Sequence, residues 1–196
     1  MAIAAVNIEV ELREVFLKDR PQLLYDISLK GTIPVLQLSD GIVIDESIDI
    51  IKWALAQSSL EWYSSNTELQ DKMIVHNDFE FKKWLDKYKY HDRNLENILD
   101  KYRNECSKTL HRYEIYLAES TYLLGENIQL VDVAIFPFVR QCANVDREWF
   151  SSRFPHTERW LEHWIHSELF RCVMPKYKVW KLDAPPLYIL FHLGGE

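Results

Sequence analysis

Acidic and hydroxyl side chains at positions 45–47 are the residues of this chain whose types and spacing best suggest a chemical role. Asp45, Glu46 and Ser47 precede an apolar run with helical spacing. The first N–H groups of a helix have no intrahelical partner, and the helix dipole favours negative charge at this end. Ser47 adds a hydroxyl to that site, so we expect a carboxylate-bearing peptide to bind there.

The residues before this cluster supply the elements that must position it. Ile33-Pro34-Val35 places a proline at the start of a predicted strand, where the peptide bond before it can be cis and a missing N–H does little harm. Asp40-Gly41 is the signal of a two-residue hairpin turn, which predicts strands at 33–38 and 42–44. A strand, a turn, a second strand and a helix therefore follow one another in a single run.

This run, Thr-Ile-Pro-Val-Leu followed at fixed spacing by Asp-Glu-Ser, resembles the glutathione-binding half of the glutathione S-transferase family. In that family a thioredoxin-like domain precedes an all-helical one. The resemblance implies that Ile33, beside a cis Pro34, forms backbone hydrogen bonds with the cysteinyl part of glutathione. It also implies that Glu46 and Ser47 hold the amine and the carboxylate of the γ-glutamyl group.

The resemblance extends into the second half of the chain. Residues 127–140 are similar to the buried helix of the family's second domain, which begins with a Ser/Thr-x-x-Asp capping box. Gln129 stands where the serine or threonine would be, and Asp132 is retained three residues later. Glutamine caps helices poorly, so we expect a weaker helix start, at a cost of up to about 1 kcal/mol.

The beginning of the chain departs from the family pattern. Members open with a strand, a loop that carries the Tyr, Ser or Cys acting on the glutathione sulfur, and a helix. Residues 1–10 resemble the end of that helix running into the second strand. We therefore expect the α/β domain to lack its first strand and catalytic loop, and we leave the catalytic residue unassigned. Cys106 is a possible replacement nucleophile, but a structural role for this thiol is favoured.

The C-terminal tail is a second predicted strand element. Residues 186–193 are apolar, β-branched and aromatic. Unpaired buried backbone groups cost roughly 1–3 kcal/mol each, so the sheet edge left without a first strand needs a partner. We hypothesise that the tail pairs with residues 10–15 or 35–38, in the same chain or from a partner, which would make Tyr188 a candidate donor to the sulfur. The alternative is a tail packed on the helical domain.

Breaks in the pattern predict two domains and a linker. Residues 1–57 alternate strand and helix signals and form the incomplete α/β thioredoxin-like domain. The polar segment 58–66 is the expected linker, and residues 67–196 form an all-helical bundle with an extended tail. A strand is predicted at 8–17, and helices are predicted at 20–26, 46–57, 67–88, 94–119, 130–145, 155–166 and 168–174.

Composition narrows the class of protein. The 196 residues carry a net charge of −7, which argues against a nucleic-acid surface. No apolar stretch of about 18 residues and no signal-peptide pattern occur, so we expect no membrane span. Cys106, Cys142 and Cys172 are odd in number and far apart, which favours a reducing compartment. We therefore expect a cytoplasmic protein.

Four further features have two interpretations each. His163 and His166 have a metal-chelating spacing but lack further ligands, so a surface pair is favoured and no metal is expected. Trp160 and Trp164 are expected in the core rather than stacked on a ligand. Cys142 is likewise expected in the core. The family resemblance implies that Tyr88 or Tyr90 lines the cleft for the electrophilic substrate. The alternative is that these residues are exposed at the end of the bundle.

Two functions from different classes remain open. The first is a transferase that binds glutathione and conjugates its thiol to a small electrophile, provided that a residue activates the sulfur. The second is a catalytically silent, transferase-like module for binding glutathione or a protein. The resemblance also implies a homodimer in which the small domain of one chain packs on the helical domain of the other.

Overall fold

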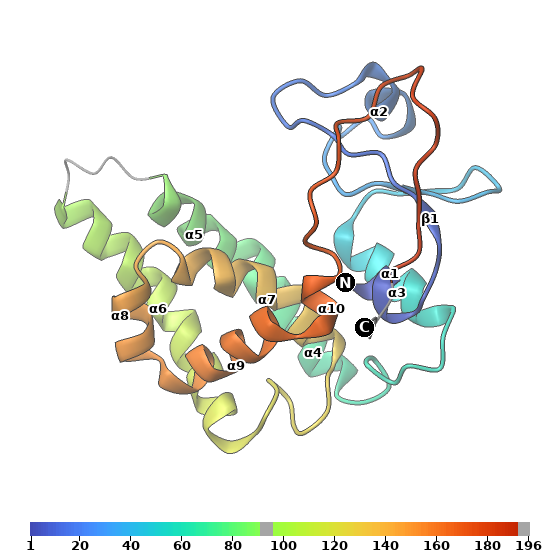
Figure 1. Cartoon of the computed structure of the whole chain (residues 1–196). Helices are drawn as coiled ribbons and strands as arrows, with labels where there is room; N and C mark the ends of the chain where they lie inside the picture. The colour runs from blue at the N-terminus through green and yellow to red at the C-terminus, as the bar shows by residue number, and fades with distance from the viewer. Residues whose placement is uncertain (91–95, 192–196) are drawn as a thin grey trace. The chain divides into compact units, whose positions relative to one another are not determined.

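The computed structural model describes residues 1–90 and 96–191 and divides the chain into two compact units (Figure 1). The first unit contains Met1–Leu60 and the residues from Glu168 onward, and the second contains Glu61–Ser167. The domain boundary drawn from the sequence stays a prediction.

Two short helices form the packed base of the first unit. Helix α1 (Ala2–Ala5) packs against helix α3 (Ser47–Ala56). Small side chains make this contact close, because Ala2, Ala4 and Ala54 are all buried. The unit also contains α2 (Gln22–Ile27) and α10 (Glu168–Arg171). The helix predicted at 46–57 is thus present as α3, and it packs against α1.

The strands of the first unit form two separate antiparallel pairs among the residues that the structure describes. Strand β2 (Leu36–Gln37) pairs with β3 (Val43–Ile44), as the hairpin signal predicted. Strand β1 (Val10–Glu11) pairs with β4 (Tyr188–Ile189). The strand predicted over 8–17 is therefore much shorter than expected, because regular pairing extends only where β4 lies opposite.

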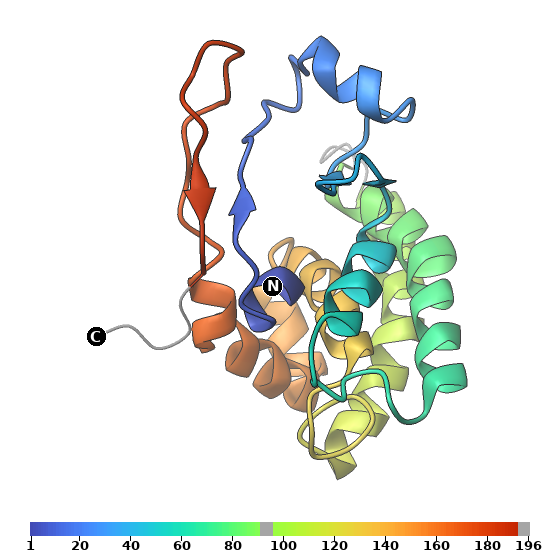
Figure 2. The same cartoon turned by 90° about the vertical axis from the view of Figure 1, so that its right-hand side faces the viewer.

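The C-terminal tail pairs with the sheet edge in the same chain, which confirms the hypothesis drawn from its composition. Figure 2 shows β4 running beside β1. In this pair Val10 lies opposite Ile189. The N–H of Leu12 donates to the carbonyl oxygen of Leu187 at 2.8 Å. Of the two edges considered, the tail uses the one at residues 10–15 and not the one at 35–38. His192 and Leu193 lie outside the described residues.

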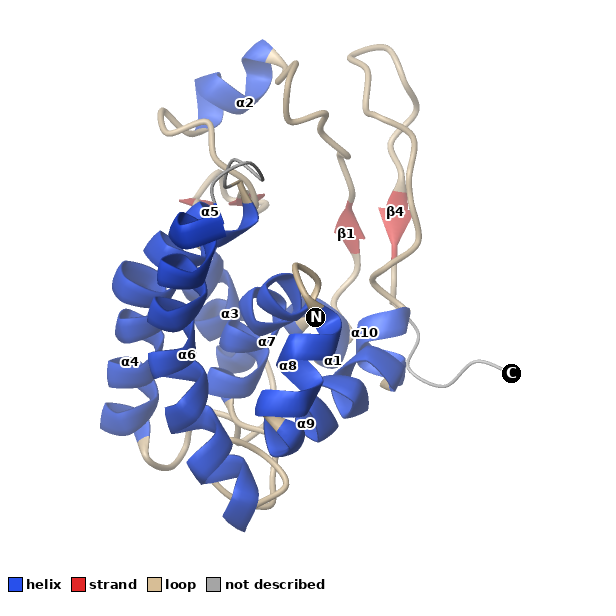
Figure 3. Cartoon of the chain, turned by 90° about the vertical axis from the view of Figure 1, so that its left-hand side faces the viewer, coloured by secondary structure: helices blue, strands red, loops and turns tan. Residues whose placement is uncertain are grey.

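Helices make up the second unit, as the three- and four-residue spacing predicted (Figure 3). The single helix predicted over 67–88 contains a π-helical turn in its middle. The predicted start of the next helix, Asn94, lies outside the described residues. The described helices are α4 (Thr67–His76), η1 (Asn77–Phe81), α5 (Lys82–Lys89), α6 (Glu96–Glu119), α7 (Leu130–Ala143), α8 (Arg147–Arg153) and α9 (Pro155–His166).

Helix α8 was not predicted, and its start shows why it forms. Asp146 caps the helix, because its Oδ1 accepts the N–H of Trp149 at 3.0 Å. The helix has only seven residues and buries one large side chain, Phe150. So short an element leaves little periodic signal, and the Asp-x-x-Trp cap is the cue that sequence reasoning missed.

The core of the second unit forms around α7 and α9. Trp160 and Trp164 are both only 1% exposed, and their rings contact Phe136 at centroid distances of 6.2 and 5.7 Å. Their interpretation as core residues is confirmed. Cys106 and Cys142 have no exposed surface, so both are structural thiols within this unit.

A buried carboxylate anchors the start of α7. Asp132 Oδ2 accepts the N–H of Gln129 at 3.0 Å, while Oδ1 accepts from the N–H of Leu123 at 2.9 Å and from Trp160 Nε1 at 3.0 Å. The Gln129 side chain donates from Nε2 to the carbonyl oxygen of Leu124 at 3.0 Å. A capping box of Gln129 and Asp132 thus begins α7, as the retained aspartate led us to expect.

Candidate functional site

The loop before β2 has the backbone geometry that the Ile-Pro sequence predicted. The Ile33–Pro34 peptide bond is cis, and both residues are exposed, Ile33 to 43%. The hairpin that follows closes at Gly41, whose φ of +90° lies in the region that favours glycine. The N–H of Ile42 donates to Asp40 Oδ1 at 3.0 Å, so the aspartate fixes this turn.

The start of α3 places Glu46 and Ser47 side by side at the surface. Glu46 has extended backbone angles and is the N-cap residue, and its carbonyl oxygen accepts the N–H of Ile50 at 3.0 Å. Ser47 is the first helical residue. The Glu46 side chain does not cap this helix. The N–H groups of its first turn therefore lack the acceptor that an N-cap side chain usually supplies, which is a suitable arrangement for an anionic ligand.

Lys30 is the site residue that sequence reasoning missed. Its Nζ lies 2.5 Å from Glu46 Oε1 and 3.1 Å from Asp45 Oδ1. The hydrogen bonds to Glu46 and Asp45 raise the pKa of Lys30. Hydrogen bonds from Ser28 Oγ, at 2.8 Å, and from Lys30 lower the pKa of Asp45. Lys30 is far from both acids in sequence, so no local spacing announced this contact.

A tight turn positions Lys30. The N–H of Gly31 donates to the carbonyl oxygen of Ser28 at 2.9 Å, and the side chains of Ser28 and Lys30 both donate to Asp45. Gly31 has a φ of +58°, and a Cβ at this position would lie 2.2 Å from Tyr25 Cε1. Glycine is therefore required here both by conformation and by space.

Two further candidates from the sequence are located by the structure. His163 Nε2 lies 3.1 Å from the hydroxyl of Tyr122, and His166 Nδ1 lies 2.9 Å from the carbonyl oxygen of Glu162. Among the residues described, no group of three or more His, Cys, Asp or Glu side chains is arranged to hold a metal ion. Tyr88 is 1% exposed and packs in the core of the second unit, whereas Tyr90 is 78% exposed.

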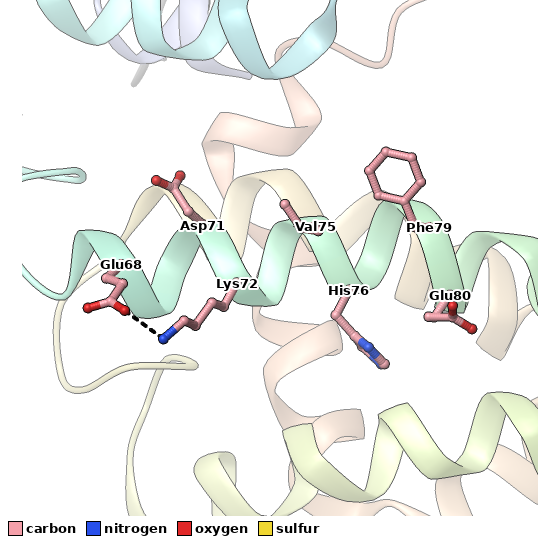
Figure 4. A pocket seen from close by; sticks show the side chains of 7 residues that line it. All are labelled: Glu68, Asp71, Lys72, Val75, His76, Phe79 and Glu80. Carbon is pink, nitrogen blue, oxygen red and sulfur yellow. Dashed lines mark hydrogen bonds and ion pairs between the residues drawn. The ribbon is translucent and has the colours of Figure 1, made fainter.

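A surface depression of about 570 Å³ runs along α4 and η1 in the second unit (Figure 4). Asp71, Val75 and Phe79 project from one side of this helix, and Val75 and Phe79 are 55% and 73% exposed. The depression contains none of the predicted site residues. It is lined by Glu68, Asp71, Lys72, Val75, His76, Phe79 and Glu80.

Solved structures show the same fold at low sequence identity. A glutathione transferase family member from Pseudomonas fluorescens pf-5, solved with two glutathione bound, has a TM-score of 0.73 and 15% identity, and the match covers 87% of this chain and 83% of that one. The glutathione transferase URE2P6 from Phanerochaete chrysosporium, in complex with oxidized glutathione, has a TM-score of 0.71 and 16% identity, with coverage of 87% and 85%. The fold class is therefore a thioredoxin-like unit with a small sheet plus a helical unit, as predicted.

Family models match both halves of the chain. The model of the N-terminal domain of glutathione S-transferases matches residues 1–57, and that of the C-terminal domain matches residues 75–168. The chain belongs to the glutathione S-transferase family, as the resemblance implied.

A protein of another function is also similar. Elongation factor 1-gamma 3 of Oryza sativa subsp. japonica is 27% identical in an alignment of 176 residues, and the match covers 80% of this chain. The chain spans only about two fifths of that relative, 41% of its length.

Within the described residues, no helix has the length and apolarity that a membrane crossing requires.

Proposed function

We propose that this chain binds glutathione at the start of α3. The carboxylate of the γ-glutamyl group accepts hydrogen bonds from Ser47 Oγ and from the first N–H groups of the helix, and its ammonium faces Glu46. The observation that carries this proposal is the exposed, uncapped start of α3 beside Glu46, within the segment that matches the N-terminal family model. The two solved relatives with glutathione bound support the class of ligand.

The cis peptide bond extends the proposed site along the ligand. The backbone of Ile33, next to Pro34, pairs with the cysteinyl part of the peptide, as the family resemblance implies. The helix dipole contributes about 0.3–1 kcal/mol to a carboxylate at an exposed N-terminus. Because Glu46 and Ser47 are exposed, we expect the backbone pairing at Ile33 to supply much of the affinity.

The proposed reaction is conjugation of the bound thiol to a small electrophile. The sulfur forms a bond to an electrophilic carbon, the leaving group departs with its electron pair, and the thiol proton passes to solvent. The protein contributes by orienting the thiol and lowering its pKa. The donor to the sulfur is unassigned, and Tyr188 in β4 stays the candidate within the first unit.

A second candidate function is a catalytically silent module that binds glutathione or another protein. The similarity to an elongation factor subunit favours it. The exposed Val75 and Phe79 beside the depression on α4 and η1 favour it as well, because apolar side chains that recur on one helix face suit a protein contact. We propose that this face forms a homodimer.

We also propose a cytoplasmic location for this protein, which the free thiols support.

Calorimetric titration with reduced glutathione tests the proposal, with an aryl-halide conjugation assay on the same samples. We expect Ser47→Ala to weaken binding roughly tenfold, because a hydrogen bond to a charged group is lost. Ser39→Ala, an exposed serine of the same unit, is the matched control and should bind normally. Binding with turnover supports the transferase, and binding without turnover supports the silent module. Absence of binding would overturn the proposed site.

A further inference from the structure

Three carboxylates surround the start of α3. Asp45 and Glu46 precede the helix, and Asp49 lies in its first turn. Lys30 contacts the first two, so it already pairs with the carboxylate that the proposed function assigns to the ammonium of the ligand. A lysine ammonium and a peptide ammonium have the same charge and the same hydrogen-bonding preference. The Lys30 ammonium and the ligand ammonium therefore compete for Glu46.

We infer that Lys30 substitutes for the γ-glutamyl ammonium on Glu46, so that this site accepts thiol peptides that lack an α-amino group. This inference rests on the proposed function and names a ligand class, the acyl-cysteinyl-glycine peptides. Glutaryl-cysteinyl-glycine, which is glutathione without its α-amino group, is the simplest member. A site whose Glu46 is already paired gains little from a ligand ammonium.

The geometry around Glu46 supports this rivalry. Lys30 Nζ lies 2.5 Å from Oε1 and so occupies one of the acceptor sites of this carboxylate. An ammonium placed on the other carboxylate oxygen would lie close to Lys30 Nζ, and like charges at that separation repel each other. A ligand ammonium at Glu46 therefore either displaces Lys30 or binds beside it against this repulsion.

The position of Lys30 is constrained from three directions. Asp45 Oδ1 holds Nζ at 3.1 Å, and Ser28 fixes Asp45 through a hydrogen bond of 2.8 Å. The turn that ends at Gly31 places the backbone of Lys30 beside both acids. The Lys30 side chain is still 51% exposed. An exposed ion pair of this kind is weak, so we expect its effect on binding to be roughly two- to fivefold.

The experiment is a cycle between Lys30 and the ligand ammonium, measured by calorimetric titration. Glutathione and glutaryl-cysteinyl-glycine are each titrated into the unmodified chain and into Lys30→Met. The measured quantity is the affinity for glutathione divided by the affinity for glutaryl-cysteinyl-glycine. Loss of the lysine charge changes the field at the ligand carboxylates equally for both peptides, so this effect cancels in the ratio. We expect a ratio near one in the unmodified chain and a ratio roughly two- to fivefold higher in Lys30→Met.

Two controls assign the effect to Glu46. Adding Glu46→Gln to Lys30→Met should return the ratio to that of the unmodified chain, because the free carboxylate is lost. Lys18→Met, at an exposed lysine of the same unit, should leave the ratio unchanged. If both peptides bind and the affinity ratio is the same in every variant, this inference is overturned and the proposed function stands. Binding of neither peptide to any variant would overturn both.

Discussion

The Oδ1 atom of Asp132 accepts a hydrogen bond of 3.0 Å from Nε1 of Trp160, deep in the second unit. This bond joins the first turn of α7 to α9, two helices that are separate in sequence. The same carboxylate holds the backbone N–H groups of Leu123 and Gln129. One side chain thus fixes the loop before α7, the start of α7 and the position of α9.

Replacing Asp132 by alanine should strongly destabilise the protein. The change leaves three buried N–H donors without an acceptor, and each unsatisfied donor costs roughly 1–3 kcal/mol. We expect the free energy of unfolding to fall by about 3 kcal/mol or more in urea titrations. Glu68→Ala, at an exposed pair with Lys72, is the control and should change it by less than about 0.5 kcal/mol. A loss of that small size in Asp132→Ala would contradict the proposed anchor.

Asp132 should also make stability depend on pH. Burial raises its pKa from 3.8 to about 6, although its three N–H donors act in the opposite direction. The folded state therefore binds this proton more tightly than the unfolded state. The resulting stabilisation is complete below the ordinary pKa and is lost as the pH rises through about 6.

The size of this effect follows from the shift of about two pKa units, which corresponds to roughly 3 kcal/mol. We expect the difference in unfolding free energy between the unmodified chain and Asp132→Asn to fall by up to that amount from about pH 4 to pH 7. Asp132→Asn does not titrate, so other ionisable groups cancel in the comparison. A constant or rising difference would show that Asp132 is ionised throughout.

Gly31 and Gly41 form a matched pair for testing the turn that carries Lys30. Both have positive φ, +58° and +90°. A Cβ at Gly31 meets the Tyr25 ring at 2.2 Å, whereas a Cβ at Gly41 has nothing within 4 Å. We expect both alanine variants to lose stability, with Gly31→Ala losing about 1–3 kcal/mol more because of the clash. Equal losses in thermal unfolding would mean that the Tyr25 ring moves aside freely.

The pairing of β1 with β4 predicts a specific cross-link. Glu11 and Tyr188 lie directly opposite each other. In a chain with Cys172→Ser, we expect Glu11→Cys combined with Tyr188→Cys to form a disulfide within one chain on mild oxidation. Non-reducing electrophoresis should show a faster monomer. Leu182→Cys, which is exposed and is not paired with β1, replaces Tyr188→Cys in the control. A cross-linked dimer would instead show exchange of the tail between chains.

The proposed homodimer face gives a fifth prediction. Phe79→Asp places a charge on an exposed apolar face of η1, where desolvation of a carboxylate opposes association. We expect light scattering to detect a dimer for the unmodified chain and a monomer for this variant. Ile115→Asp, at another exposed apolar residue of the same unit, should remain dimeric. A dimer that survives Phe79→Asp would place the interface elsewhere.

Much of the fold was predictable because it depends on local signals. The Asp40-Gly41 turn, the acidic start of α3 and the helical spacing of α9 each act within a few residues, and the structure contains all three. The exact limits of β1 were not predictable. Its length is set by β4 at the other end of the chain, and such pairing leaves no local trace.

The candidate site was predictable only in part, for the same reason. Glu46 and Ser47 are adjacent in sequence, so their joint position follows from the helix start. Lys30 reaches Glu46 only because the turn at Gly31 bends the chain back, and that turn depends on space beside the Tyr25 ring. The roles of Ile33, Pro34, Glu46 and Ser47 toward a ligand stay predictions that the titrations above decide.

The pairing of β1 with β4 has a consequence for synthesis on the ribosome. β4 emerges only after the whole second unit has been translated. Until then the edge of β1 has no partner, so the N-terminal segment is exposed to chaperones and to wrong strand partners. The helical unit, which is continuous in sequence, is able to fold first. We expect the order of folding in the cell to run opposite to the order of translation, with the N-terminal unit completed last.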